Sequence, residues 1–176
     1  MAKDTARVSF IFRVTAFLLF LIYLYLLLKL VLFRGITPHA FVERLADVNV
    51  ERLSRGIQYI SNFIPFRTIW NYIAHHSNRF VAFYNVVGNV AAFMPFGYLL
   101  PLLLPSQFRA LRIAAASFLF SLLLECLQLL GAVGSFDVDD LILNTAGGVL
   151  GYWLLQGLRQ ARALLSGKRK TKPYQS

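Results

Sequence analysis

Four long apolar runs constrain this chain more than any other feature of its sequence. Residues 14–33, 80–104, 113–133 and 141–158 each form a mainly apolar stretch of 18 residues or more. A helix needs roughly 20 such residues to cross the hydrocarbon core of a bilayer. A single span in lipid must satisfy its own backbone hydrogen bonds, as a helix does. The sequence therefore predicts an all-α integral membrane protein, built as a bundle of about four transmembrane helices in a single domain.

The composition agrees with this prediction and limits the partners. Of the 176 residues, 57% are hydrophobic and only 15% are charged, and the net charge is +10. Nucleic-acid binding needs a basic face on a water-soluble fold, and these runs leave no room for one. We expect membrane lipids, in particular anionic ones, to be the partners of the charge.

The first run follows Lys3, Arg7 and Arg13, as the apolar part of a secretory signal peptide would. Its length and the lack of an A-x-A-like cleavage site favour a retained helix. After it, residues 34–79 form a long polar connection in which Phe63 and Trp70 flank Arg67. Aromatic side chains of this kind favour the headgroup level, so we expect an interfacial or re-entrant segment here.

The distribution of Lys and Arg predicts the orientation. The N-terminus, the connection before residue 113 and the tail 159–176 together hold 11 basic residues, whereas the other side holds 7 in a much longer loop. By the positive-inside rule, both termini and the basic tail face the cytoplasm, and the loop 34–79 is outside.

Six polar side chains in the last three runs, or directly before the last one, are expected to meet near the outer surface, in pairs at i, i+3 or i, i+4: Asn85 and Asn89, Glu125 and Gln128, Asp140 and Asn144. A charged group at the centre of a membrane helix costs roughly 2.5–3.5 kcal/mol on insertion scales. Glu125 should therefore point into the bundle. It either joins helices through hydrogen bonds or belongs to a ligand or proton site.

The acidic run Asp137, Asp139 and Asp140 precedes the last helix, and Asp139 or Asp140 is expected to cap it. Because no EF-hand or H-E-x-x-H spacing occurs, we predict no metal site and interpret His39, His75 and His76 as surface residues. Arg67 suits a phosphate or carboxylate partner, or serves as an interfacial anchor.

The last run also contains Gly147, Gly148 and Gly151. The small-x-x-x-small spacing of Gly147 and Gly151 lets helix backbones approach closely, so we expect this helix to pack tightly inside the bundle. The only cysteine, Cys126, excludes a disulfide within the chain and is interpreted as a buried hydrophobe.

Several short motifs occur in a fixed order: Asn62-Phe63-Ile64-Pro65-Phe66-Arg67, Asn85-Val86-Val87-Gly88-Asn89, Phe93-Met94-Pro95-Phe96-Gly97, Glu125-Cys126-Leu127-Gln128, Asp137-Val138-Asp139-Asp140, Asn144-Thr145-Ala146-Gly147-Gly148 and Gly151-Tyr152. From about residue 60 to 152, the chain resembles the VanZ-like family of bacterial membrane proteins. The resemblance implies four helices, the bacterial cytoplasmic membrane and, from the founding member, an association with teicoplanin resistance. It implies no known reaction.

Three functions are compatible with these features. The first is binding of an envelope lipid, a lipid-linked cell-wall precursor or an amphiphilic glycopeptide antibiotic in an outer polar pocket. The second is a membrane enzyme acting on such a lipid, with Glu125 or Asp140 as general base. The third is a small transporter, which would require several chains to assemble. The sequence shows no set of nucleophile, base and orienting group, which an enzyme would need. We therefore favour binding and expect no cofactor.

Overall fold

Four long helices dominate the structure, a computed structural model that describes residues 2–75, 79–104 and 109–166. They are α1 (Ala2–Val31), α5 (Arg79–Leu103), α6 (Ala110–Leu130) and α7 (Val138–Leu165). Each is long and apolar enough to cross a membrane. The predicted all-α bundle with about four spanning helices is therefore confirmed.

The helices differ from the apolar runs mainly at their ends. The helix α1 begins at Ala2 instead of near residue 14, and α7 continues to Leu165 instead of stopping near 158. A helix satisfies its own backbone hydrogen bonds, so it does not have to end where the apolar run ends. The first basic residues of the predicted tail, Arg159 and Arg162, consequently belong to α7. The basic run at 168–172 lies outside the described residues.

Helix α6 ends three residues before the end of its apolar run. Gly131 closes the helix by donating its backbone N–H to Leu127 O, at 2.8 Å. Ala132 then adopts a φ of 48°, in the left-handed region, and turns the chain toward α7. Residues 131–133, predicted as helix, are therefore part of the α6–α7 connection.

Helices α5 and α7 form the central pair of the bundle, and glycines set their distance. A Cβ atom added to Gly147 would lie 2.2 Å from Val90 O, and one added to Gly151 would lie 1.9 Å from Met94 O. From the other side, a Cβ on Gly97 of α5 would lie 1.7 Å from the Gly148 carbonyl oxygen. No larger residue fits between these backbones without moving one of them.

Helix α1 packs against α5 through aromatic side chains. The Phe20 and Phe96 rings lie 5.8 Å apart between centroids, and the Tyr23 hydroxyl donates to Ala92 O at 2.8 Å. Large side chains from several elements share this core: Leu27, Leu32, Phe41, Phe93, Phe96 and Leu124.

Between α1 and α5, the chain forms four short elements, α2 (Pro38–Ala46), α3 (Val50–Arg55), the π-helix Gly56–Ile60 and α4 (Arg67–His75). Arginines of α2 and α3 cover the carboxyl end of α6. The Arg44 guanidinium donates to Ala132 O at 2.9 Å, and Arg52 donates to Leu130 O at 3.3 Å. Cations are stabilising at this end of a helix dipole, so the connection is fastened to α6.

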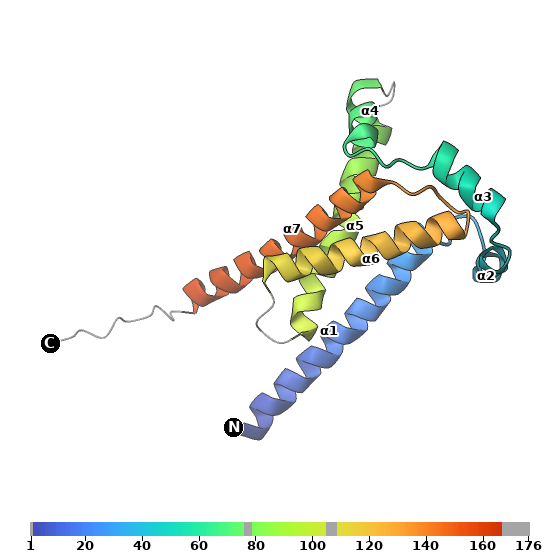
Figure 1. The fold of residues 1–176 in the computed structure, drawn as a ribbon. Coiled ribbons are helices and arrows are strands. Elements are labelled where there is room, and N and C mark those ends of the chain that lie inside the picture. The colour runs from blue at the N-terminus through green and yellow to red at the C-terminus, as the bar shows by residue number, and fades with distance from the viewer. Residues whose placement is uncertain (1, 76–78, 105–108, 167–176) are drawn as a thin grey trace.

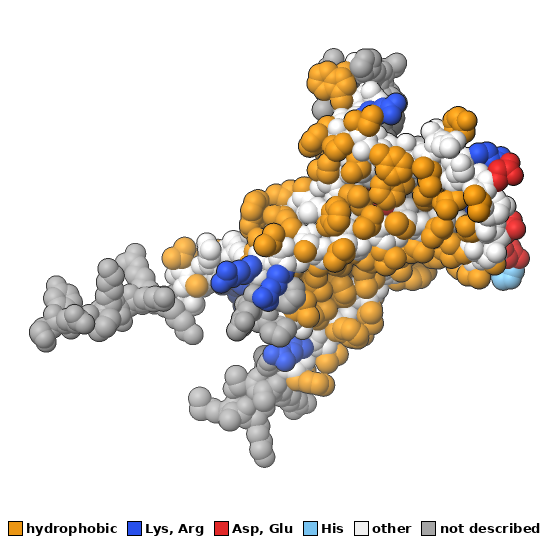
Figure 2. All heavy atoms as spheres, viewed as in Figure 1, with side chains coloured by type: hydrophobic (Ala, Val, Ile, Leu, Met, Phe, Trp, Pro, Cys, Tyr) orange, Lys and Arg blue, Asp and Glu red, His pale blue; other side chains and the backbone are white. Residues whose placement is uncertain are grey.

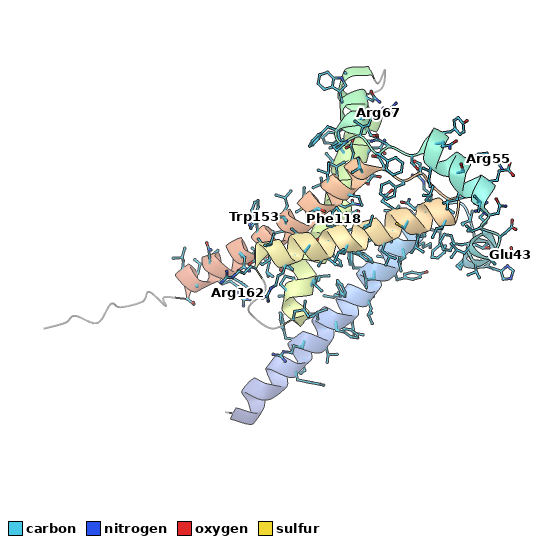
Figure 3. All side chains as sticks on the ribbon, in the orientation of Figure 1. Glu43, Arg55, Arg67, Phe118, Trp153 and Arg162 are labelled. Carbon is cyan, nitrogen blue, oxygen red and sulfur yellow. The ribbon has the colours of Figure 1, made fainter. Side chains whose placement is uncertain are left out.

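The elements divide the molecule into two ends and a middle. The start of α1, the end of α5, the start of α6 and the end of α7 lie at one end, and α2, α3 and α4 lie at the other (Figure 1). Figure 2 shows hydrophobic side chains over the middle of the visible face, with acidic side chains at the end formed by α2 and α3. Phe118 and Trp153, labelled in Figure 3, are 43% and 58% exposed. Such an apolar surface belongs in lipid, so the chain is a multi-pass membrane protein.

Candidate functional site

A cavity of about 380 Å³ lies between the four long helices, at the end of the bundle where α2, α3 and α4 gather. The end of α1, the first half of α5, the last turns of α6 and the first turns of α7 form its walls. Its polar lining residues are Arg34, Tyr84, Asn85, Asn89, Glu125, Gln128, Asp140 and Asn144. Its other lining residues are Leu27, Leu30, Val31, Gly88, Ala92, Phe93, Leu124 and Val133. The cavity is thus amphipathic, with polar and apolar groups on its walls.

Within the part of the chain that the structure describes, the two carboxylates of the cavity each accept one hydrogen bond. The backbone N–H of Asp137 donates to Glu125 Oε2 at 2.9 Å, and the Asn89 amide donates to Asp140 Oδ1. Glu125 is only 3% exposed, although it belongs to a helix that can span the membrane. Its side chain therefore points into the bundle, where an ionisable group in a spanning helix is least costly.

Two amide side chains of the cavity connect neighbouring helices. Asn144 of α7 donates to the Ser121 hydroxyl of α6 at 2.9 Å, within the buried interior. Gln128 donates to Val31 O at the end of α1, at 3.4 Å. Asn85 is more exposed than the other amides, one turn before Asn89 along α5. Two amide side chains of the cavity wall therefore also join helices: Asn144 joins α7 to α6, and Gln128 joins α6 to α1.

The remaining predicted site residues, Arg67, Asp137 and Asp139, do not line this cavity. Asp139 is fully buried, and its carboxylate accepts from three backbone N–H groups at the start of α4. These belong to Phe66, Thr68 at 2.7 Å and Ile69 at 3.0 Å. A carboxylate at this position satisfies N–H groups that have no partner within the helix. Asp139 thus caps α4 from a different helix.

Asp137, and not Asp139 or Asp140, is the N-cap of α7, so the predicted cap was wrong. Its Oδ1 accepts from the Asp139 backbone N–H at 2.9 Å and from the Asn62 amide at 2.9 Å. Its Oδ2 accepts from the Thr68 hydroxyl at 2.7 Å. The sequence could not separate these carboxylates, because their partners lie about 70 residues earlier in the chain.

The turn before α4 is fixed by these bonds and carries exposed aromatic residues. Backbone bonds join Asn62 to the start of α7: its N–H donates to Phe136 O at 2.8 Å, and its carbonyl accepts from Val138 N–H at 3.0 Å. Phe66 has a φ of 66°, a left-handed conformation that a bulky residue rarely adopts. Arg67 begins α4 with an exposed side chain (Figure 3).

Sequence reasoning missed three residues of the site and its surroundings, Arg34, Tyr84 and Ser121. Arg34 lines the cavity, yet in the sequence it was counted only as a charge. Ser121 binds Asn144, and a signal for it was present: Ser117, Ser121 and Glu125 are spaced four apart and share one buried face of α6.

Neither His39 nor Cys126 is among the described residues that line the cavity. His39 pairs with Glu43 at 3.4 Å on the exposed surface of α2, and His76 lies outside the described residues. Cys126 is a free thiol of intermediate exposure. Among residues 2–75, 79–104 and 109–166, no group of three or more His, Cys, Asp or Glu side chains is placed to hold a metal ion.

A protein-family model described as VanZ/LLP1 matches residues 17–159. The chain belongs to the VanZ/LLP1 family. This confirms the resemblance predicted from residues 60–152 and extends it through the second half of α1, where the sequence motifs were not diagnostic. Every residue that lines the cavity lies within the VanZ/LLP1 match. Neither the curated proteins nor the solved structures include a match to this chain.

Proposed function

We propose that this VanZ-like protein binds an amphiphile of the bacterial cell envelope in the cavity, and thereby contributes to teicoplanin-type antibiotic resistance. The amphiphile is a membrane lipid, a lipid-linked cell-wall precursor or the glycopeptide antibiotic itself. One observation carries the proposal: a single cavity with many apolar lining residues is also lined by six polar residues from three helices, Asn85, Asn89, Glu125, Gln128, Asp140 and Asn144. Ligand sites combine an apolar lining with a few convergent polar groups in this way.

The volume and position of the cavity support the same conclusion. About 380 Å³ is enough for a polar headgroup but not for a complete two-chain lipid, so the acyl chains would remain in the bilayer. The cavity lies beside Leu27 and Leu30 of α1, which is a spanning helix with many exposed apolar side chains. A headgroup bound here would keep its chains in contact with lipid.

The proposed orientation puts the cavity at the outer surface of the cytoplasmic membrane. Arg109 and Arg112 lie at the start of α6 and Arg159 and Arg162 in the last turns of α7, and both of these helix ends are opposite α2 and α3 (Figure 1). The acidic residues Glu43 and Glu51 belong to α2 and α3. The positive-inside rule then puts both termini in the cytoplasm. A reporter that works only in the cytoplasm should be active when it is fused after residue 176. Activity of a reporter that works only outside the cell would reverse the orientation.

Filling the cavity tests the proposed binding. Gly88 lines the cavity, and a Cβ atom added to it would meet nothing within 4 Å. Gly88→Phe should therefore fold, occupy the cavity and lower both the amount of co-purified lipid and the teicoplanin resistance of the host. Gly157→Phe is the matched control, because a Cβ there also meets nothing within 4 Å but the residue is not in the cavity wall.

Equal lipid content and equal resistance in the two glycine variants would refute the proposal. The double substitution Glu125→Gln with Asp140→Asn tests the polar wall in the same assays, and a wild-type result there would leave these residues with a structural role only. Incubating the purified protein with labelled envelope lipids separates binding from chemistry, because the appearance of product would replace the binding role with an enzymatic one.

A further inference from the structure

Among the described residues, the hydrogen bonds around the cavity leave carboxylate oxygens available to a ligand. The Asn89 amide N–H donates to the Asp140 carboxylate, and the Gln128 amide N–H donates to the Val31 carbonyl. Both partners can only accept when Asp140 is ionised, so the orientation of each amide is fixed, and each amide keeps its oxygen and a second N–H. Glu125 and Asp140 each accept through one oxygen, and the second oxygen of each carboxylate accepts from no other described residue.

Cationic and apolar side chains continue from the carboxylates along the last turns of α1 and the residues that follow it. A second hollow is lined by Leu26, Lys29, Leu30, Phe33 and Arg34, and it shares Leu30 and Arg34 with the cavity. The shared arginine therefore stands between the acidic wall and an apolar groove that also carries Lys29. In order, a ligand would meet carboxylates, then two cations, then apolar side chains.

We propose that the cavity and this groove together bind a phospholipid whose headgroup ends in a primary ammonium. The proposal rests on the proposed function and names the class of its ligand. The ammonium, with three N–H donors, matches the free oxygens of Glu125 and Asp140. The phosphate lies at Arg34 and Lys29, since both side chains are phosphate-binding cations. An acyl chain follows Leu26 and Phe33 into the bilayer.

Changing the lipid tests this order without changing the protein. Native mass spectrometry of the purified full chain would compare dioleoylphosphatidylethanolamine with its N-acetyl derivative, which has the same phosphate and acyl chains but no ammonium. Dioleoylphosphatidylcholine and dioleoylphosphatidylglycerol complete the panel, because neither headgroup can place an N–H donor between the carboxylates. The ethanolamine lipid should bind about tenfold more tightly than each of the others, as expected for a charge-assisted hydrogen bond.

Substitutions of equal shape should then move the preference in a defined way. Glu125→Gln and Asp140→Asn each retain an oxygen that can accept the bonds from Asp137 and Asn89, so they remove charge and leave the scaffold. Each should reduce the preference for the ethanolamine lipid over its N-acetyl derivative by about tenfold. Arg34→Gln should weaken all four phospholipids alike. Arg55→Gln is the control, since Arg55 is exposed on α3 and pairs with Glu51.

The outcomes separate this inference from the proposed function. Equal binding of the ethanolamine lipid and its N-acetyl derivative to the wild-type chain overturns the ammonium site. If Gly88→Phe still lowers the binding of those lipids, the cavity remains a lipid site with a different headgroup. If Gly88→Phe and wild type bind every lipid of the panel equally, the proposed function fails together with the inference.

Discussion

Replacing Asp139 by Ala should detach α4 from the bundle without unfolding the four long helices. The carboxylate is fully buried and accepts the backbone N–H groups of Phe66, Thr68 and Ile69. Helix α4 has nine residues, too few to be stable in isolation. Its structure therefore depends on this cap and on its contacts with α5 and α7.

The magnitude follows from the number of hydrogen bonds and from their access to water. A net contribution of about 1 kcal/mol for each of three bonds gives about 3 kcal/mol for Asp139→Ala. These bonds contribute less than is typical of charged acceptors, because Phe66 is 61% exposed and water can reach this turn. Asp139→Asn retains one acceptor oxygen and should cost less, about 1–2 kcal/mol.

Hydrogen exchange followed by mass spectrometry measures this effect locally in the detergent-solubilised protein. A loss of about 3 kcal/mol corresponds to roughly 100-fold faster exchange in the peptide that covers residues 62–75. Peptides from α6 should keep their protection. Glu51→Ala is the control, because this residue is 82% exposed and its ion pair with Arg55 should contribute less than about 0.5 kcal/mol. Unchanged exchange of residues 62–75 in Asp139→Ala would refute the capping role.

Three further predictions concern the packing of the bundle. Gly151→Ala should lower the free energy of unfolding in detergent by about 1–3 kcal/mol, because its Cβ would lie 1.9 Å from a backbone oxygen. Gly157→Ala is the control and should be neutral or stabilising. Equal melting temperatures of the two variants would contradict the close contact of α5 and α7. Ser121→Ala should cost about 0.6–1 kcal/mol through its lost hydrogen bond, and Ser117→Ala should cost almost nothing because the buried Ser117 hydroxyl has no partner among the described residues. Arg52→Ala removes donors to two carbonyl oxygens and should lower the melting temperature by an amount equivalent to about 1–2 kcal/mol; a wild-type melting curve would exclude its role as a cap of α6.

The helices and the grouping of the six polar cavity residues follow from local sequence rules. Runs of apolar residues give the spans, and alternating helix directions bring Asn89, Glu125 and Asp140 to the same end of the bundle. The structure brings them to one cavity, with Asn89 bonded to Asp140. Periodicity and helix direction are therefore sufficient to predict which side chains meet, provided that they lie on the same helix or at the same level of two adjacent helices.

The roles of Asp137, Asp139 and Arg34 could not be predicted in this way. Asp137 and Asp139 bind a turn about 70 residues earlier in the chain, and no local pattern says that this turn returns to the start of α7. The left-handed conformation of Phe66 is equally hidden, because propensity disfavours it and only the tertiary bonds stabilise it. Arg34 lies just beyond α1, where a basic residue also serves as an ordinary interfacial anchor.

The central claim is that the cavity between α1, α5, α6 and α7 holds the headgroup of an amphiphile. The most direct test is a high-resolution cryo-electron microscopy map of the full chain in nanodiscs made from the lipids of the host membrane, with a fiducial bound to enlarge the particle. We expect density for a headgroup within hydrogen-bond distance of Glu125 and Asp140, continuous with an acyl chain along Leu26 and Phe33. A cavity that contains only water, or that is closed by its own side chains, would contradict the account.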